Sequence, residues 1–381
     1  MPPYDVNFGK VAQRRLELPI ARERRMELET CAYCPRLCRA VCPVSNAEPR
    51  EALIPWGKMT SLLSAEPSEV RLEPWGCTGC GACTELCRHD NPVAEVLIEG
   101  RASVFAAGRA PEAAVRVAHE HPGRLLRQAA HIERLGALVE ADPAAPTALL
   151  LGCATLQSSP GMAEEVVTLT GQLAKRPLRL VAECCGLIPS LAGDASGARL
   201  AQERLGRALQ GVDRLIVADP GCHRAVGELV GGRRSLARQL EHTSFLAFAA
   251  GRAAGGKHEL RRVDRPGIRY GWQPPCWARG TSAEPAARVL LEQLVGEFVD
   301  VEPGCTGGGG LVPSVLPDAS RRIGVSRLEA LRAAGVDCVV TGCASGARRL
   351  RASAQSMPDR ADTAPDVVEL TSLLRQAIEE P

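Results

Sequence analysis

The sequence predicts a multidomain α+β protein, in which a small α-helical domain precedes a duplicated α/β domain. Sixteen cysteines support this prediction, because half of them fall in two short runs between positions 31 and 87. After residue 146 the pattern changes, and apolar strand-like segments alternate with helical ones. The spacing of the cysteines in that later part is repeated. The expected units are a helical domain at 1–105, a helical connector at 106–146, and α/β repeats at 147–255 and 266–381.

Length and composition narrow the class of protein. The chain has 381 residues, of which 45% are hydrophobic and 24% charged, as in ordinary globular proteins. The net charge of +2 and an aromatic content of 3% give no basis for binding nucleic acid. No apolar run approaches the ~20 residues that span a bilayer. Many cysteines without an export signal favour a cytoplasmic protein, either free or peripheral at the inner face of the membrane.

The first domain is expected to be helical outside its cysteine runs. Residues 11–30, rich in Arg and Glu, predict a surface helix broken at Pro19, with a solvated face or a face for a partner or membrane. A second helix is expected at Lys58–Leu63. Trp56 and Trp75 flank the runs, and we expect them to exclude water from whatever the cysteines hold.

The two cysteine runs predict iron–sulfur ligation. Residues 77–87 read C-x2-C-x2-C-x3-C, the spacing by which bacterial ferredoxins hold [4Fe-4S] clusters, and Gly79 and Gly81 suit the tight loop. Residues 31–42 differ by one residue and end in Cys42-Pro43, as the ferredoxin pattern does. In two-cluster ferredoxins the fourth thiolate of each run reaches the other cluster. The expected ligand sets are therefore Cys31, Cys34, Cys38 and Cys87 for one cluster, and Cys42, Cys77, Cys80 and Cys83 for the other.

Zinc is the main alternative, since paired C-x2-C knuckles also form zinc ribbons. Three closely spaced thiols followed by a fourth one helical turn later are not ribbon spacing, which favours clusters. A disulfide framework fits less well without an export signal.

The later part of the chain predicts parallel sheets with helical crossovers. Helices are expected within 111–141 and a linker at Pro143–Pro146. The first repeat is expected to have strands beginning at Thr147, Arg179 and Arg214, and helices near 162–174 and 198–209. The second is expected to have strands at 268–276, 298–305 and 336–343, and helices near 285–294 and 321–334.

Three pairs of cysteines share nearly one offset, which indicates an internal duplication. Cys276 follows Cys153 by 123 residues, Cys305 follows Cys185 by 120, and Cys343 follows Cys222 by 121. All six end predicted strands, and the carboxyl ends of parallel strands meet at one rim where ligands bind. We therefore expect these thiols to converge on sites, whereas Cys338, in mid-strand, is expected to pack in the core.

These features together resemble a known architecture, in which a two-cluster ferredoxin-like module precedes a duplicated cysteine-rich domain of the heterodisulfide reductase type. The iron–sulfur subunits of glycolate oxidase and of anaerobic glycerol-3-phosphate dehydrogenase share it. The resemblance covers about residues 31–345. In the second module it is carried by Cys184-Cys185-Gly186, by Asp219-Pro-Gly-Cys222 and by the glycine-rich segment 304–310.

The chain departs from that family pattern, in which each half has a Cys, then Cys-Cys-Gly, then Cys-x-x-Cys. The last thiol of the first half is replaced by Ala225, leaving Cys153, Cys184, Cys185 and Cys222 for one cubane cluster or one zinc ion. The second half has Gly304 and Gly346 at two ligand positions, leaving Cys276, Cys305 and Cys343 for a cluster with an open iron, or for no group. A five-thiolate cluster is poorly supported in either half.

Other residues near these thiols allow fewer conclusions. His223 beside Cys222 and Trp277 beside Cys276 are candidates to replace a missing ligand or to cover a site. No Lys-Ser/Thr follows the Gly307–Gly310 run, so close backbone approach to a cluster is a better use of it than phosphate binding.

The resemblance implies an electron-transfer subunit. Because the chain shows no flavin or nucleotide fingerprint, a flavoprotein dehydrogenase partner would oxidise a small substrate and pass electrons through two [4Fe-4S] clusters. The electrons would leave through the cysteine-rich domain to a quinone, a membrane subunit or a thiol–disulfide couple. One alternative is a catalytic subunit that reduces a disulfide at the C-terminal cysteines. The other is a scaffold stabilised by metal.

Overall fold

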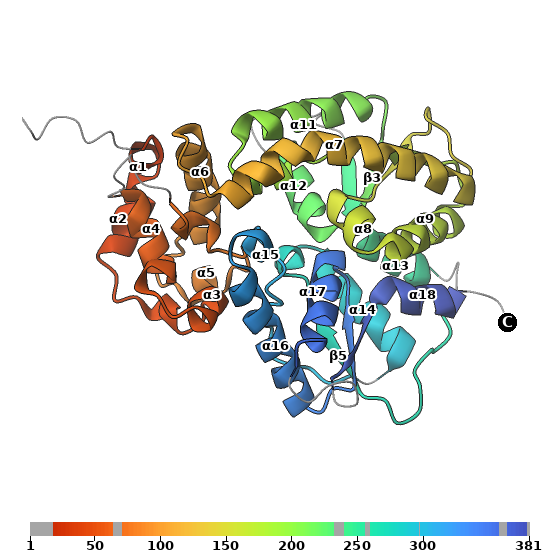
Figure 1. Ribbon diagram of the computed structural model, residues 1–381. Helices are drawn as coiled ribbons and strands as arrows, with labels where there is room; N and C mark the ends of the chain where they lie inside the picture. Colours follow the sequence, from red (N-terminus) through yellow and green to blue (C-terminus); the bar gives the residue numbers. More distant parts are fainter. Residues whose placement is uncertain are drawn as a thin grey trace, which may run out of the picture.

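The computed structural model describes residues 18–63, 71–231, 240–255, 260–296, 298–357 and 364–378, and residues 11–17 of the expected N-terminal helix lie outside this part. A helical domain lies beside two α/β units that face each other, as Figure 1 shows with the chain coloured from red to blue. The predicted α+β class, with a helical domain before a duplicated α/β domain, is confirmed.

The N-terminal domain is built from short helices around a small apolar core. They are α1 (Ile20–Glu23), α2 (Arg25–Ala32), α3 (Pro43–Ala47), α4 (Pro55–Leu63), α5 (Ala82–Leu86) and α6 (Val93–Ala106), with the 3-10 turns η1 (Leu37–Arg39), η2 (Glu51–Leu53) and η3 (Glu73–Trp75). The helix expected at 58–63 begins earlier, because a proline is tolerated in a first helical turn. Ile20 and Leu28 are fully buried, so the segment expected at the surface is solvated on one face only. Trp75 is fully buried and Trp56 half-buried.

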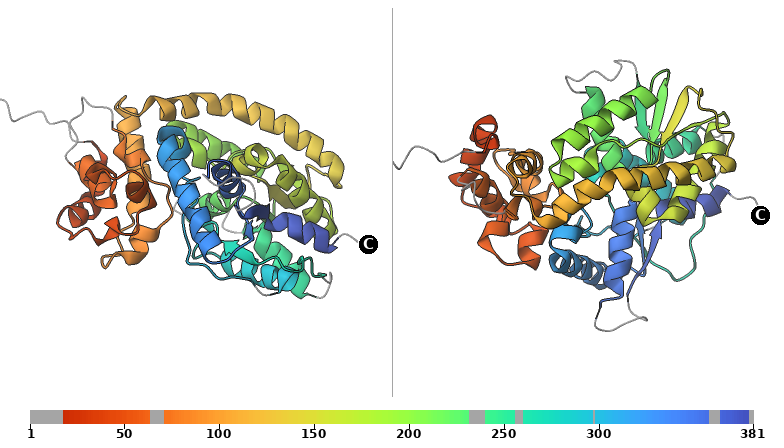
Figure 2. Two further views of the ribbon diagram at one scale, coloured as in Figure 1. Left: turned by 60° about the horizontal axis from the view of Figure 1, so that its bottom comes forward. Right: turned by 45° about the horizontal axis from the view of Figure 1, so that its top comes forward.

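A long helix joins the two parts of the molecule. α7 (Glu112–Leu135) occupies most of the expected connector and ends in the 3-10 turn η4 (Gly136–Leu138). Figure 2 shows it running from the helical domain along the α/β units. Its buried stripe includes Val117, His121, Ile132 and Leu135.

The first repeat is a four-stranded parallel sheet in the order β2-β1-β3-β4. The strands are β1 (Thr147–Leu150), β2 (Arg179–Val181), β3 (Arg214–Val217) and β4 (Glu241–Ser244). The helices are α8 (Cys153–Ser158), α9 (Pro160–Ala174), α10 (Leu187–Ala192), α11 (Ala195–Ala208), α12 (Pro220–Gly231) and α13 (Phe245–Ala254). The sequence did not predict β4, because Glu-His-Thr-Ser has no apolar pattern and lies at a sheet edge.

The second repeat has the same arrangement with one strand fewer. Its sheet has the order β5-β6-β7, from β5 (Tyr270–Gln273), β6 (Cys338–Thr341) and β7 (Asp366–Glu369). Its helices are α14 (Ala283–Val295), α15 (Val312–Val315), α16 (Pro317–Ala333), α17 (Ala344–Ala354) and α18 (Leu370–Ile378), with the turn η5 (Cys276–Ala278). Cys338 is buried in the core, as expected.

The strand expected at 298–305 is wrong as a full strand. Only Val299 bridges to the sheet, where its N–H donates to the carbonyl of Tyr270. Side chains provide the next contacts, because Asp300 accepts from Arg288 and the Glu302 carbonyl accepts from Arg327. With this bridge counted, the strand order matches that of the first repeat, which supports the duplication.

The two repeats share one apolar core. Phe245 and Leu246 of the first and Trp272, Leu290 and Leu374 of the second belong to the same buried cluster. α13 packs on α14 and α9 on α18, so the carboxyl ends of both sheets face a common space. None of the described helices has the length and apolar character needed to cross a bilayer.

Candidate functional site

Four cysteines of the N-terminal domain gather at its surface. We call Cys31, Cys34, Cys38 and Cys87 the outer group. The pKa of the Cys31 thiol is raised to about 12, first by burial and then by the neighbouring Cys38, Cys87 and Cys34 thiols. The carboxamide of Asn91 donates to the Cys31 sulfur over 3.2 Å. The structure therefore brings together the four thiols of the first expected set.

The other four lie deeper, and we call Cys42, Cys77, Cys80 and Cys83 the inner group. Burial raises the pKa of the Cys83 thiol, and Cys77, Cys80 and Cys42 raise it further. The Lys58 ammonium, only 1% exposed, donates to the Cys42 sulfur over 3.5 Å. Gly79 and Gly81 have φ values of 73° and 80°, the left-handed conformation expected of the loop.

A buried arginine holds the inner group against both repeats. The Arg101 guanidinium is 1% exposed and donates to four carbonyl oxygens, those of Pro74, Cys77, Leu191 and Gly310, at 2.9–3.1 Å. Pro74 and Cys77 belong to the N-terminal domain, Leu191 to the first repeat and Gly310 to the second. Burial lowers the pKa of Arg101 to about 10, so it stays charged at neutral pH.

The four thiols of the first repeat form two buried pairs. Each lies a few residues beyond a strand end, as expected. The sulfurs of Cys153 and Cys184 are 3.7 Å apart, and those of Cys185 and Cys222 are 3.1 Å apart. The N–H of Gly186 donates to the Cys184 sulfur at 3.2 Å. Gly152 has a φ of 87°, and a side chain there would meet the Cys222 sulfur.

The second repeat offers three thiols, and an N-terminal one joins them. The pKa of Cys305 is raised to about 12, first by a hydrogen bond with Cys276. A hydrogen bond with Cys305 is the main cause of a raised pKa at Cys80. The Cys305 thiol also donates to the Thr78 hydroxyl at 3.5 Å. Sequence reasoning missed this contact between Cys80 and the second repeat, because no spacing relates residues 225 positions apart.

Cys343 lies on the cavity side of the second repeat. It is the N-cap of α17, where its sulfur accepts from the N–H of Gly346 at 3.4 Å. Burial raises its pKa to about 12, and the Asp219 carboxyl of the first repeat adds to that shift. Asp219 itself has a raised pKa because it is buried, although it accepts from the N–H of Cys222 at 2.9 Å. In the sequence, Asp219 stands out only as part of the family motif Asp219-Pro-Gly-Cys222.

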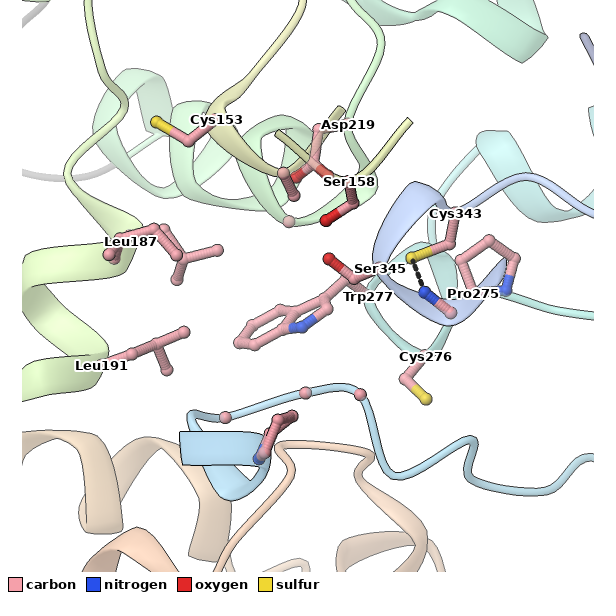
Figure 3. Close-up of a pocket in the computed structure, with 18 of the residues that line it drawn as sticks. Cys153, Ser158, Leu187, Leu191, Asp219, Pro275, Cys276, Trp277, Cys343 and Ser345 are labelled. Carbon is pink, nitrogen blue, oxygen red and sulfur yellow. Dashed lines mark hydrogen bonds between the residues drawn. The ribbon is translucent and has the colours of Figure 1, made fainter. Parts of the chain in front are cut away.

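The space between the repeats is a cavity of about 210 Å³. Thiols of both repeats line it, together with Asp219, His121 and Trp277. Figure 3 shows the Trp277 indole in the middle of this space, with Leu187 and Leu191 on one side and Ser345 near it. His121 is buried, and its Nε2 has no hydrogen-bond partner among the described residues.

The Trp277 ring lies between the inner loop and the first repeat. Its ring lies against Gly79 of the inner loop, and also near Gly221. The ring of His223 packs against that of His242, with centroids 5.6 Å apart. The glycine run approaches the inner loop closely, because side chains at Gly309 or Gly310 would overlap the backbone of Thr78 and Cys77. Its expected approach to a cluster stays a prediction.

The chemistry of these donor sets fits iron–sulfur clusters. Burial and mutual repulsion raise the pKa of thiols in all the groups, so several thiolates are stable there only beside a cationic partner. Thiolates are the ligands of [4Fe-4S] clusters, and the backbone N–H groups of Gly79, Gly186 and Gly307 already donate to three of the sulfurs.

Comparisons with known proteins agree with this description. A 4Fe-4S dicluster domain matches residues 27–91, and a cysteine-rich domain matches twice, at 147–227 and 270–349. A subunit of the fumarate reductase (CoM/CoB) of Methanothermobacter marburgensis is 27% identical over 83% of this chain and 66% of its own length. An uncharacterized iron–sulfur protein of Methanocaldococcus jannaschii is 33% identical over 29% of this chain and 24% of its own. The chain thus spans just under two thirds of the first relative and about a quarter of the second.

The two matches of the cysteine-rich domain confirm the duplication, and the dicluster match covers all eight cysteines of the outer and inner groups. The chain therefore binds iron–sulfur groups, and it contains a 4Fe-4S dicluster domain followed by a duplicated cysteine-rich domain.

Proposed function

We propose that this chain is the electron-transfer subunit of a flavin-dependent oxidoreductase complex, with one [4Fe-4S] cluster held by the outer group and one by the inner group. Bound clusters would each take up and release one electron at a time. The observation that carries the proposal is the approach of Cys305 to the inner loop, where its thiol donates to the Thr78 hydroxyl at 3.5 Å and lines one hollow with Cys80. This approach joins the N-terminal cysteines to those of the second repeat. The thiols of the outer group, of the inner group and of the cavity then follow one another through the molecule, as a route for electrons requires.

The surrounding residues support this use. Lys58 and Arg101 place two buried positive charges beside the inner group, which favours an added electron there. The buried Trp75 and the indole of Trp277 limit the access of water. The absence of a flavin fingerprint in the sequence motivates a separate flavoprotein that supplies the electrons.

Anaerobic purification with iron, sulfide and zinc analysis and EPR tests the cluster assignment. We expect about eight iron atoms from the N-terminal domain, and about four more if the first repeat holds a cubane cluster. Two zinc ions with no sulfide would refute the assignment. The partner is tested separately, because oxidation of a hydroxy acid by the purified chain with an artificial acceptor would make a flavoprotein unnecessary.

The cavity favours a second candidate, in which the cysteine-rich domain itself reduces a disulfide. Breaking an S–S bond to give two thiols takes two electrons and two protons. The buried Asp219 carboxyl, whose pKa is raised by burial, lines the cavity and is placed to supply a proton. The name of the first relative describes a reductase and includes CoM and CoB. A change in the EPR spectrum on adding a disulfide, abolished in Cys305→Ser, would favour this reaction, and a quinone acceptor would leave that spectrum unchanged.

A further inference from the structure

Exposed apolar side chains surround the outer group. Met26, Tyr33, Leu37 and Leu86 are 75%, 89%, 60% and 42% exposed. They are half of the strongly exposed large apolar residues in the part of the chain that the structure describes. We call these four residues the outer patch. Single exposed apolar residues need no explanation, but several gathered at one site usually mark an interaction surface.

Local structure explains why these residues lie near one another. Met26 and Tyr33 are seven positions apart at the two ends of α2, so they share one face of the helix. The turn η1, which carries Leu37, packs against α5, which carries Leu86. Cys34, Cys38 and Cys87 are only partly buried among them. An approaching molecule would therefore meet apolar side chains and thiols of the outer group together.

The rim of the outer patch carries positive charge without matching carboxylates. Arg36 stacks on the Trp56 ring at 3.6 Å and Arg88 is exposed, and neither has an ion pair with another described residue. The nearby acidic side chains are mostly engaged, because Glu51 pairs with Arg39 and Glu85 with Arg279. Asp90, next to His89, and Glu23 on α1 are exposed and have no ion pair with another described residue. The unpaired positive charge on this rim favours a partner that carries acidic side chains around its own contact surface.

We propose that the outer patch is the docking surface for a one-electron redox protein with acidic side chains around its exposed cofactor. The inference rests on the proposed function, since it identifies where electrons enter. A small apolar centre with a charged rim fits the weak, short-lived complexes of electron-transfer proteins, which bury less than about 1,200 Å². Charge on the rim raises the association rate and makes it depend on salt.

A bacterial flavodoxin, a small acidic flavoprotein, serves as the probe. ¹⁵N-labelled oxidised flavodoxin is titrated with the full-length, cluster-loaded chain, and the loss of its amide signals gives a dissociation constant without any electron transfer. The patch variant carries Tyr33→Ser and Leu86→Ser. The matched control is Leu126→Ser on α7, where the leucine is 76% exposed but lies outside the outer patch.

We expect the patch variant to bind flavodoxin at least tenfold more weakly and the control to stay within twofold of the unaltered chain. Arg88→Glu should also weaken binding, as should added salt. Electron transfer from fully reduced flavodoxin should slow at least tenfold in the patch variant, while reduction by methyl viologen and the EPR spectrum stay unchanged.

Three results would overturn the docking surface: no binding by the unaltered chain, equal binding by the patch and control variants, or a dimer of the chain that the patch variant dissociates. The last would make a second copy the occupant. A chain that methyl viologen cannot reduce would instead contradict the proposed function, and the binding measurement would still be valid.

Discussion

The outer and inner cysteine groups have the same number of thiols and similar spacings, but their surroundings differ. The outer group lies among exposed apolar residues, and a neutral carboxamide, that of Asn91, donates to it. The inner group lies beside Lys58 and Arg101 and touches the second repeat through Cys80. Two loops with similar cysteine spacing thus form one exposed site and one buried site. The residues that pack around each loop determine whether its thiols are exposed or buried. If both groups hold clusters, the inner one should have the higher reduction potential.

The largest expected effect is on the attachment of the inner group. Arg101→Met would leave four buried carbonyl oxygens without their donor, so we expect a loss of about 3–5 kcal/mol in the free energy of unfolding. Denaturant titration of the anaerobic protein, followed by circular dichroism, measures it. Arg24→Met is the control, because Arg24 forms a partly exposed ion pair with Glu99 worth less than about 1 kcal/mol. Equal losses would show that Arg101 does not hold the domains together.

The next effect concerns the close approach of the second repeat to the inner loop. Gly310→Ala places a methyl group onto the carbonyl of Cys77, whereas Gly81→Ala meets nothing nearby. Both glycines have positive φ, so their backbone strain is similar and the difference isolates the overlap. We expect Gly310→Ala to cost about 1–3 kcal/mol more than Gly81→Ala in the same titration. A difference near zero would mean that the interface adjusts freely.

The charge beside the inner group should be visible in its redox potential. Lys58→Met removes a buried cation and disfavours the reduced cluster, so the inner potential should fall by about 100 mV. Lys58→Arg keeps the charge and should stay near the original value. An EPR-monitored titration resolves the two clusters. A fall in the outer potential instead would contradict the assignment of Cys42 to the inner cluster.

The smallest effect is expected at the outer group. Asn91→Leu removes a neutral hydrogen bond to the Cys31 sulfur, so the outer potential should fall by about 20–60 mV while the inner one stays constant. Asn46→Leu is the control, because that carboxamide donates to the carbonyl of Ala40 and to no sulfur among the described residues. If the two variants gave the same potentials, the hydrogen bond would have no electronic effect.

The sequence by itself determined the features that depend on local spacing. The sequence predicted the cysteine loops that begin at Cys31 and Cys77 and the left-handed glycines at 79 and 81. It also predicted the strands β1, β2, β3, β5 and β6, because each of these features rests on residues close together in the chain. The edge strands β4 and β7 were not predicted, because their places depend on pairing with β3 and β6 and not on their own patterns.

Only the tertiary structure decided how the modules meet. Cys80 meets Cys305, Arg101 donates to the carbonyls of Leu191 and Gly310, and Trp277 lies over Gly79. These contacts join residues that are 90 to more than 200 positions apart. Such contacts form where the surfaces of the N-terminal domain and of the two repeats pack together. The spacing of residues within any one of these units carries no information about that packing.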